Sequence, residues 1–189
     1  AASAFASPAP AVPPRAGGLS GNVMLSGAWA LYPMALKWAE EFQKVQPGVR
    51  VDIQAGGAGK GIADALAGIV DFGMVSRDIQ PAETDRGALA FAVCKDAVVA
   101  TTSARNPVLG AVLAAGLDKR GFAAIWIDET AATWGAVLGT ADRTPLNAYT
   151  RSDACGAAET WAQFLGKKQE DLKGIGVYGD PGLAEAVRR

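Results

Sequence analysis

Three short turns of small residues have the composition of anion-binding sites. They are Ser26-Gly27-Ala28 with Trp29 after it, Gly56-Gly57-Ala58-Gly59-Lys60-Gly61, and Cys155-Gly156-Ala157. Each turn stands ahead of an apolar pattern typical of a helix, whose N-terminus presents unpaired N–H groups and a partial positive charge. Arg77, at the end of a predicted strand, and Arg151, just before the third turn, add bidentate donors. These residues together predict a receptor for a small anion.

The glycine-rich turn matches neither of the common nucleotide-binding motifs. A P-loop needs glycine where this chain has Gln54 and a hydroxyl residue where it has Gly61. A GxGxxG pattern that begins at Gly57 or Gly59 would end on Ile62 or Asp64. A plain flexible turn is the alternative. The position of the turn, after a predicted strand and before a predicted helix, favours anion binding.

Composition excludes several classes of function. The chain has 189 residues, of which 50% are hydrophobic, and a net charge of -1, so we expect a globular protein without a nucleic-acid partner. It has no histidine, which excludes Ser-His-Asp, Cys-His and HExxH chemistry. Two cysteines without CxxC spacing give no zinc site, and the sequence leaves open whether Cys94 and Cys155 form a disulfide. We expect no metal and no cofactor.

The N-terminal region differs in composition from the rest. Residues 1–18 are rich in Ala, Pro, Ser and Gly, and Ala4-Phe5-Ala6 fits the small-x-small pattern of signal-peptide cleavage. Either the end of an export signal with a linker or a plain flexible tail fits this segment. No apolar run elsewhere is long enough to span a membrane. We expect a flexible linker over residues 1–20, a first α/β lobe over 21–98 and a second over 99–189.

Strand and helix patterns alternate along the chain. Short apolar or alternating runs predict strands at residues 22–25, 49–53, 71–75, 97–101 and 146–150. Helical spacing predicts helices at residues 31–42, 62–69, 83–90 and 160–165, and residues 108–127 look like helix and connection. This alternation favours an α/β fold that binds ligands at the carboxyl ends of parallel strands.

Four motifs, taken in order, resemble one protein family. They are Ser-Gly-Ala followed by Pro33 and Lys37-Trp38, then Ala-Gly-Gly-Ala-Gly-Lys-Gly-Ile, then Val70 to Arg77, and Tyr-Thr-Arg-Ser-Asp-Ala-Cys-Gly. From about Gly21 to the end, the chain resembles the phosphate-binding proteins of bacterial ABC importers, in the type II periplasmic-binding-protein superfamily. The resemblance implies two α/β lobes joined by a hinge, which close on an oxyanion.

The resemblance also implies a site, a partner and a location. The implied ligand-binding residues are Ser26, Gly27, Ala28, Trp29, Gly57, Ala58, Gly59, Ser76, Arg77, Arg151, Cys155, Gly156 and Ala157. The implied partner is a membrane ABC permease, and the implied location is periplasmic or extracellular. A full-length protein of this kind is expected to be a monomer. The family usually extends further, so we expect the second lobe to be incomplete at its C-terminus.

Two departures from the family leave the anion open. The third turn is Cys155-Gly156-Ala157, where the phosphate binders commonly have Ser-Gly-Thr, and Arg77 follows Ser76, where they have an aspartate that accepts a phosphate proton. Phosphate is the first candidate, and sulfate, molybdate, tungstate or a small carboxylate are alternatives. An enzyme that uses Cys155 as nucleophile and a sensor or adhesion module are the competing functions.

Overall fold

The N-terminal part of the chain forms a parallel three-stranded sheet. The computed structural model describes residues 18–188, where β1 (Ser20–Gly27), β2 (Gly48–Ala55) and β3 (Phe72–Met74) lie in the order β2-β1-β3. Residues 1–17, which hold most of the expected linker and the cleavage pattern, lie outside the described part. Gly27 pairs with both Ala55 and Met74, so the three carboxyl ends meet at one edge of the sheet.

Helices α1 (Tyr32–Val45) and α2 (Ala58–Leu66) pack on this sheet, α1 against β2 and α2 against β1 and β3. Pro33 lies in the first turn of α1, where its missing N–H costs no helical hydrogen bond. We call residues 18–87 the first lobe. The strand–turn–helix order predicted for this region is confirmed.

The core of the first lobe is built from small side chains. Ala28, Ala35, Ala58 and Met74 are buried, and partly buried apolar residues of β1, β2 and α1 pack around them. Gly61 of α2 lies so close to the sheet that a Cβ there would be 2.5 Å from the Met74 carbonyl oxygen. Glycine at this position therefore lets α2 contact the backbone of β3.

The C-terminal part of the chain, residues 103–188, forms the second lobe. Its strands β4 (Tyr149–Arg151) and β5 (Ile175–Val177) pair in parallel, with Arg151 beside Val177. Its helices, in chain order, are α4 (Leu109–Ala115), α5 (Lys119–Trp126), α6 (Trp134–Leu138), α7 (Gly156–Phe164), the 3-10 helix η1 (Gln169–Asp171) and α8 (Gly179–Arg188). The rings of Trp126 and Trp161 lie 5.4 Å apart and join α5 to α7.

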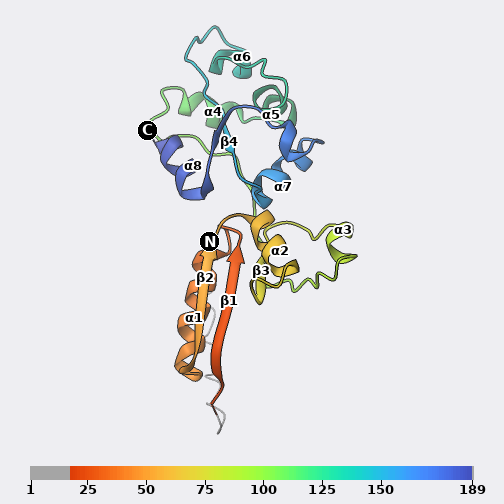
Figure 1. The fold of residues 1–189 in the computed structure, drawn as a ribbon. Helices are drawn as coiled ribbons and strands as arrows, with labels where there is room; N and C mark the ends of the chain where they lie inside the picture. Colours follow the sequence, from red (N-terminus) through yellow and green to blue (C-terminus); the bar gives the residue numbers. More distant parts are fainter. Residues whose placement is uncertain (1–17, 189) are drawn as a thin grey trace.

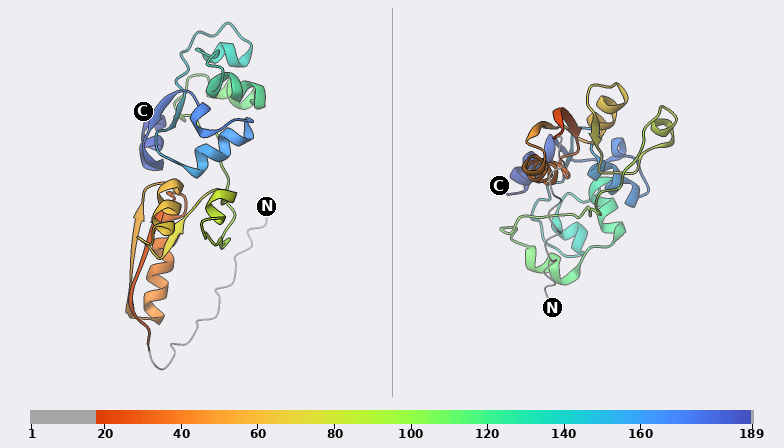
Figure 2. Two further views of the ribbon diagram at one scale, coloured as in Figure 1. Left: turned by 45° about the vertical axis from the view of Figure 1, so that its right-hand side comes forward. Right: turned by 90° about the horizontal axis from the view of Figure 1, so that it is seen from below.

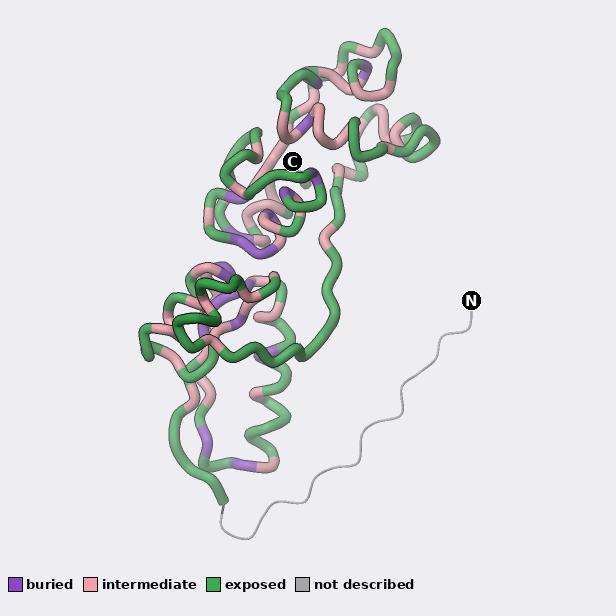
Figure 3. Tube along the Cα trace, turned by 90° about the vertical axis from the view of Figure 1, so that its right-hand side faces the viewer, coloured by how far each residue is buried: buried purple, intermediate pink, exposed green. Residues whose placement is uncertain are grey.

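Residues 88–102 connect the lobes without regular secondary structure. The helix predicted at residues 83–90 is wrong, because α3 (Pro81–Thr84) ends after four residues. The buried strand predicted at residues 97–101 is also wrong, since no described strand pairs with it and Val99 is 70% exposed. Figure 3 shows this connector as a long, largely exposed stretch. An apolar pattern predicts burial only where a neighbouring element is available to cover it.

The two lobes meet end to end (Figures 1 and 2), with β1 pointing toward the second lobe. Gly57, just after β2, lies against Asp153 and Ala154, which follow β4. Trp29, just after β1, lies against Gly179, which follows β5. The carboxyl ends of both sheets therefore face the junction between the lobes.

The described residues contain neither a disulfide, nor a cluster of metal ligands, nor a membrane-spanning helix. Cys94 is exposed, Cys155 is buried, and both are free, so no disulfide joins them. No three His, Cys, Asp or Glu side chains gather in residues 18–188 as metal ligands would. The helices of this same part lack the length and apolar character that a membrane crossing requires.

We predict that Gly61→Ala destabilises the first lobe by about 1–3 kcal/mol, because the added methyl group would overlap the backbone of β1 and β3. Urea unfolding followed by tryptophan fluorescence measures the effect. Gly110→Ala is the matched control, since nothing lies within 4 Å of a Cβ at that helical glycine. Equal stability of the two variants would contradict the packing described for α2.

Candidate functional site

The predicted site residues gather at the junction of the lobes, but two of them point inward. Ser26 is fully buried, and its hydroxyl donates to Asp64 Oδ2 at 2.6 Å. The Ala28 N–H donates to the Met74 carbonyl at 2.8 Å. These groups hold the first lobe together, so in this state neither of them faces the junction as a donor. Hydrogen bonds with Lys60 and Ser26 lower the pKa of Asp64, which keeps its carboxylate charged.

The glycine-rich turn forms the first-lobe side of the junction. Gly57 has a φ of 91°, and a Cβ there would lie 2.6 Å from the Ala154 carbonyl oxygen. The Gly59 N–H donates across the junction to the same carbonyl at 3.1 Å. Glycine is needed here because L side chains rarely adopt this φ and because no room is left for a side chain.

The third turn forms the opposite side. Cys155 precedes α7, its N–H donates to Gln169 Oε1 at 3.0 Å, and a Cβ on Gly156 would lie 2.5 Å from the Ser76 carbonyl oxygen. Burial raises the pKa of the Cys155 thiol, although hydrogen bonds from the Ala158 and Ala157 N–H groups act against this. The thiol is therefore protonated at neutral pH and is a weak nucleophile.

Arg151 is the buried charge of the site. It ends β4, and its side chain is 3% exposed. Its Nε donates to Asp153 Oδ1 at 2.8 Å, and its Nη2 donates to Asp153 Oδ2 at 2.5 Å. Its Nη1 donates to Asp180 Oδ1. Burial alone would lower the pKa of Arg151, but the hydrogen bond with Asp153 and the neighbouring negative charges outweigh burial and raise it.

Arg77 is engaged within its own lobe. Its guanidinium binds both carboxylate oxygens of Glu83, at 2.6 and 2.9 Å, and the two side chains are 12% and 14% exposed. The hydrogen bond from Arg77 holds the pKa of Glu83 below its usual value. The charge of Glu159 in the second lobe also acts on Arg77.

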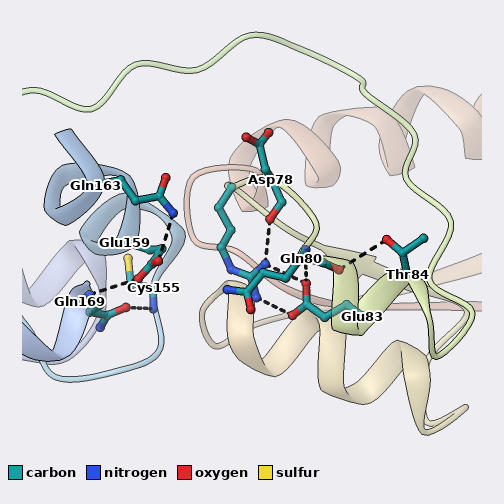
Figure 4. A network of polar contacts seen from close by, with 9 residues as sticks. Asp78, Gln80, Glu83, Thr84, Cys155, Glu159, Gln163 and Gln169 are labelled. Carbon is teal, nitrogen blue, oxygen red and sulfur yellow. Dashed lines mark hydrogen bonds and ion pairs between the residues drawn. The ribbon is translucent and has the colours of Figure 1, made fainter. Parts of the chain in front are cut away.

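A polar cavity of about 480 Å³ lies between these groups. Gly59, Arg77 and Gln80 line it from the first lobe, and Arg151 and Cys155 are among the residues that line it from the second. Figure 4 shows Gln80 and Glu83 on one side and Cys155, Glu159 and Gln169 on the other. Arg151 is thus a guanidinium that a small ligand in this cavity could reach.

Trp29 bridges the two lobes at the junction. Its ring meets Tyr178 edge to face at 6.1 Å and lies against Gly179. Its indole N–H is buried and has no hydrogen-bond partner among the described residues. A buried donor of this kind is costly unless it is satisfied, so Trp29 is a candidate ligand donor.

Sequence reasoning missed the carboxylates that surround the two arginines. Asp153 stands two residues after Arg151, and this Arg-x-Asp spacing was visible in the chain. Asp180 follows β5 in the same way that the predicted turns follow their strands, so Tyr178-Gly179-Asp180 is a fourth strand–turn–helix junction. Glu83 lies in the segment that was predicted as a helix.

Comparison with known proteins identifies the family of this chain. The family model of the PBP superfamily domain matches residues 12–189. The phosphate-binding protein PstS of Pseudomonas aeruginosa strain PAO1 is 29% identical over 205 residues, which cover 100% of this chain and 61% of that protein. Phosphate-binding protein PstS 2 of Streptococcus agalactiae serotype V is 32% identical over 89 residues, or 47% of this chain and 30% of that protein.

Solved structures agree on the fold. A Clostridium perfringens protein, described as a phosphate ABC transporter substrate-binding protein with bound phosphate, superposes with a TM-score of 0.71 at 24% identity. The match covers 88% of this chain and 66% of that one. A phosphate transport receptor from Vibrio cholerae superposes with a TM-score of 0.56 at 16% identity, over 88% of this chain and 67% of that one. The chain spans 61% and 30% of the length of the PstS relatives from Pseudomonas aeruginosa and Streptococcus agalactiae, and about two thirds of each of these solved chains. Its fold is that of phosphate-binding proteins.

We predict that Gly57→Ala forces the lobes apart, because its Cβ would overlap Ala154 and the strained φ would relax. Small-angle X-ray scattering should then show a larger radius of gyration. Gly68→Ala is the control, since Gly68 also has a positive φ but nothing lies within 4 Å of its Cβ position. An unchanged radius for Gly57→Ala would contradict the contact between the lobes.

Proposed function

The chain belongs to the PBP superfamily, and we propose that it is the substrate-binding protein of an ABC transporter, which captures a small inorganic oxyanion between its lobes. Phosphate is the first candidate, because the relatives in Pseudomonas aeruginosa and Streptococcus agalactiae are named phosphate-binding proteins. The protein would act outside the cytoplasm and deliver the anion to a membrane permease without changing it chemically.

The observation that carries this proposal is the buried guanidinium of Arg151 beside the cavity between the lobes. A guanidinium has five N–H donors, and three of them are used by Asp153 and Asp180, which leaves two for a ligand. One remaining N–H lies on each terminal nitrogen of the guanidinium, and a guanidinium can bind an oxyanion through both of these nitrogens. The Trp29 indole N–H would add one more donor, and the partial positive charges at the N-termini of α2 and α7 would favour an anion.

The composition of the turns bears on which anion binds. Cys155, Ala157 and Ala58 offer no hydroxyl donors, and Arg77 is no proton acceptor. Sulfate, molybdate and tungstate, which need no acceptor, are therefore the alternatives to phosphate. Calorimetric titration with these four anions tests the proposal, and saturable binding of one of them is the expected result.

We predict that Arg151→Ala weakens anion binding by about 2–5 kcal/mol, because a buried charge-assisted partner of the ligand is lost. Arg151→Lys keeps the charge and should recover only part of the affinity, since an ammonium cannot donate in bidentate fashion. Arg50→Ala, at an exposed arginine paired with Asp52, is the control. Affinity that survives in both Arg151 variants would remove Arg151 from the site.

We predict that Cys155→Ser leaves anion affinity within about threefold of the wild-type value, because a binding protein needs the main-chain N–H groups of this turn rather than a thiolate. The same calorimetric titration measures it. A cysteine enzyme is the competing function, and it would lose its turnover in this variant. Turnover of a phosphorylated or carboxylate compound that disappears in Cys155→Ser would favour the enzyme.

A further inference from the structure

The net charge of the groups around Arg151 disfavours an incoming anion. Arg151 brings one positive charge, and its hydrogen-bond partners Asp153 and Asp180 bring two negative charges when both are ionised. The cluster then carries a net charge of about -1. An anion that binds the two remaining N–H groups of Arg151 would meet this excess negative charge at close range.

The two carboxylates differ in how firmly they are held. Asp153 grips Arg151 with both oxygens, its side chain is 7% exposed, and its Oδ1 also accepts from the Gly179 N–H at 3.3 Å. Asp180 has one bond to Arg151, and its side chain is 46% exposed. Asp180 is therefore the carboxylate that can exchange a proton with water.

The surroundings of Asp180 also favour its neutral form. Burial, followed by the charges of Asp153 and of Asp96 in the connector, raises the pKa of Asp180, and Arg151 acts in the opposite direction. The Cys155 thiol also interacts electrostatically with Asp180. Arg105, which lines the same side of the second lobe, donates to the Arg188 carbonyl at the far end of α8.

We propose that Asp180 takes up a proton from solvent when the site binds an oxyanion, so that anion binding is coupled to protonation of this one carboxylate. A protonated Asp180 can still accept the hydrogen bond from Arg151 through its carbonyl oxygen. The cluster then becomes neutral, and the guanidinium charge is available to the anion. This inference rests on the proposed function.

Sulfate is the probe for this coupling, because it keeps both charges over the pH range in which carboxylates titrate. Calorimetry in two buffers of different ionisation enthalpy should show proton uptake when the wild-type protein binds sulfate at neutral pH. Wild-type affinity should rise as the pH falls. Asp180→Asn should take up no proton, bind sulfate about tenfold or more tightly at neutral pH, and lose most of the pH dependence.

Glu185→Gln is the matched control. It removes one negative charge from the same helix, but Glu185 pairs with Arg188 at the surface and not with Arg151. This variant should behave like the wild-type protein. Equal sulfate affinity of the wild-type and Asp180→Asn proteins, or wild-type binding without proton uptake, would overturn the inference and leave the proposed function intact. If neither protein binds phosphate, sulfate, molybdate or tungstate, the proposed function fails, and the inference fails with it.

Discussion

A buried guanidinium governs the arrangement of the second lobe. Arg151 ends a three-residue strand, and a charge that is almost fully removed from water is tolerated only when hydrogen-bonded counter-charges surround it. Asp153 supplies them from the following turn, and Asp180 supplies them from the start of α8. The pairing of β4 with β5 brings both to the same edge. The position of α8 and the electrostatics of the site thus depend on one side chain.

The small residues of the turns serve packing as much as ligand binding. Gly57 and Gly156 each approach the backbone of the other lobe more closely than any side chain would permit, and Gly59 donates across the junction to Ala154. In this state the lobes touch through main-chain atoms at these glycines and through the ring of Trp29, and a polar cavity lies beside Arg151. The close contact explains why positions 57 and 156 are glycine.

Local patterns predicted most of the first lobe, because β1 and β2 are each followed by a turn and an amphipathic helix that packs on the sheet. The helix predicted after β3 is the exception, since α3 has four residues. Local patterns also located the junction, since turns after parallel strands meet at one edge. Long-range partners could not be predicted: Asp180 lies 29 residues from Arg151, and nothing in that spacing shows that they meet. The inward orientation of Ser26 depends on Asp64, and the strand predicted at residues 97–101 lacks a partner edge.

The central claim is that an oxyanion binds at Arg151, where the carboxyl ends of both sheets converge. A crystal structure of the protein soaked with tungstate tests it most directly, because anomalous scattering locates tungsten without assumptions about the ligand. The account predicts a single strong peak within hydrogen-bond reach of the Arg151 guanidinium, between the N-termini of α2 and α7. Full tungsten occupancy elsewhere in the molecule, with none beside Arg151, would contradict it.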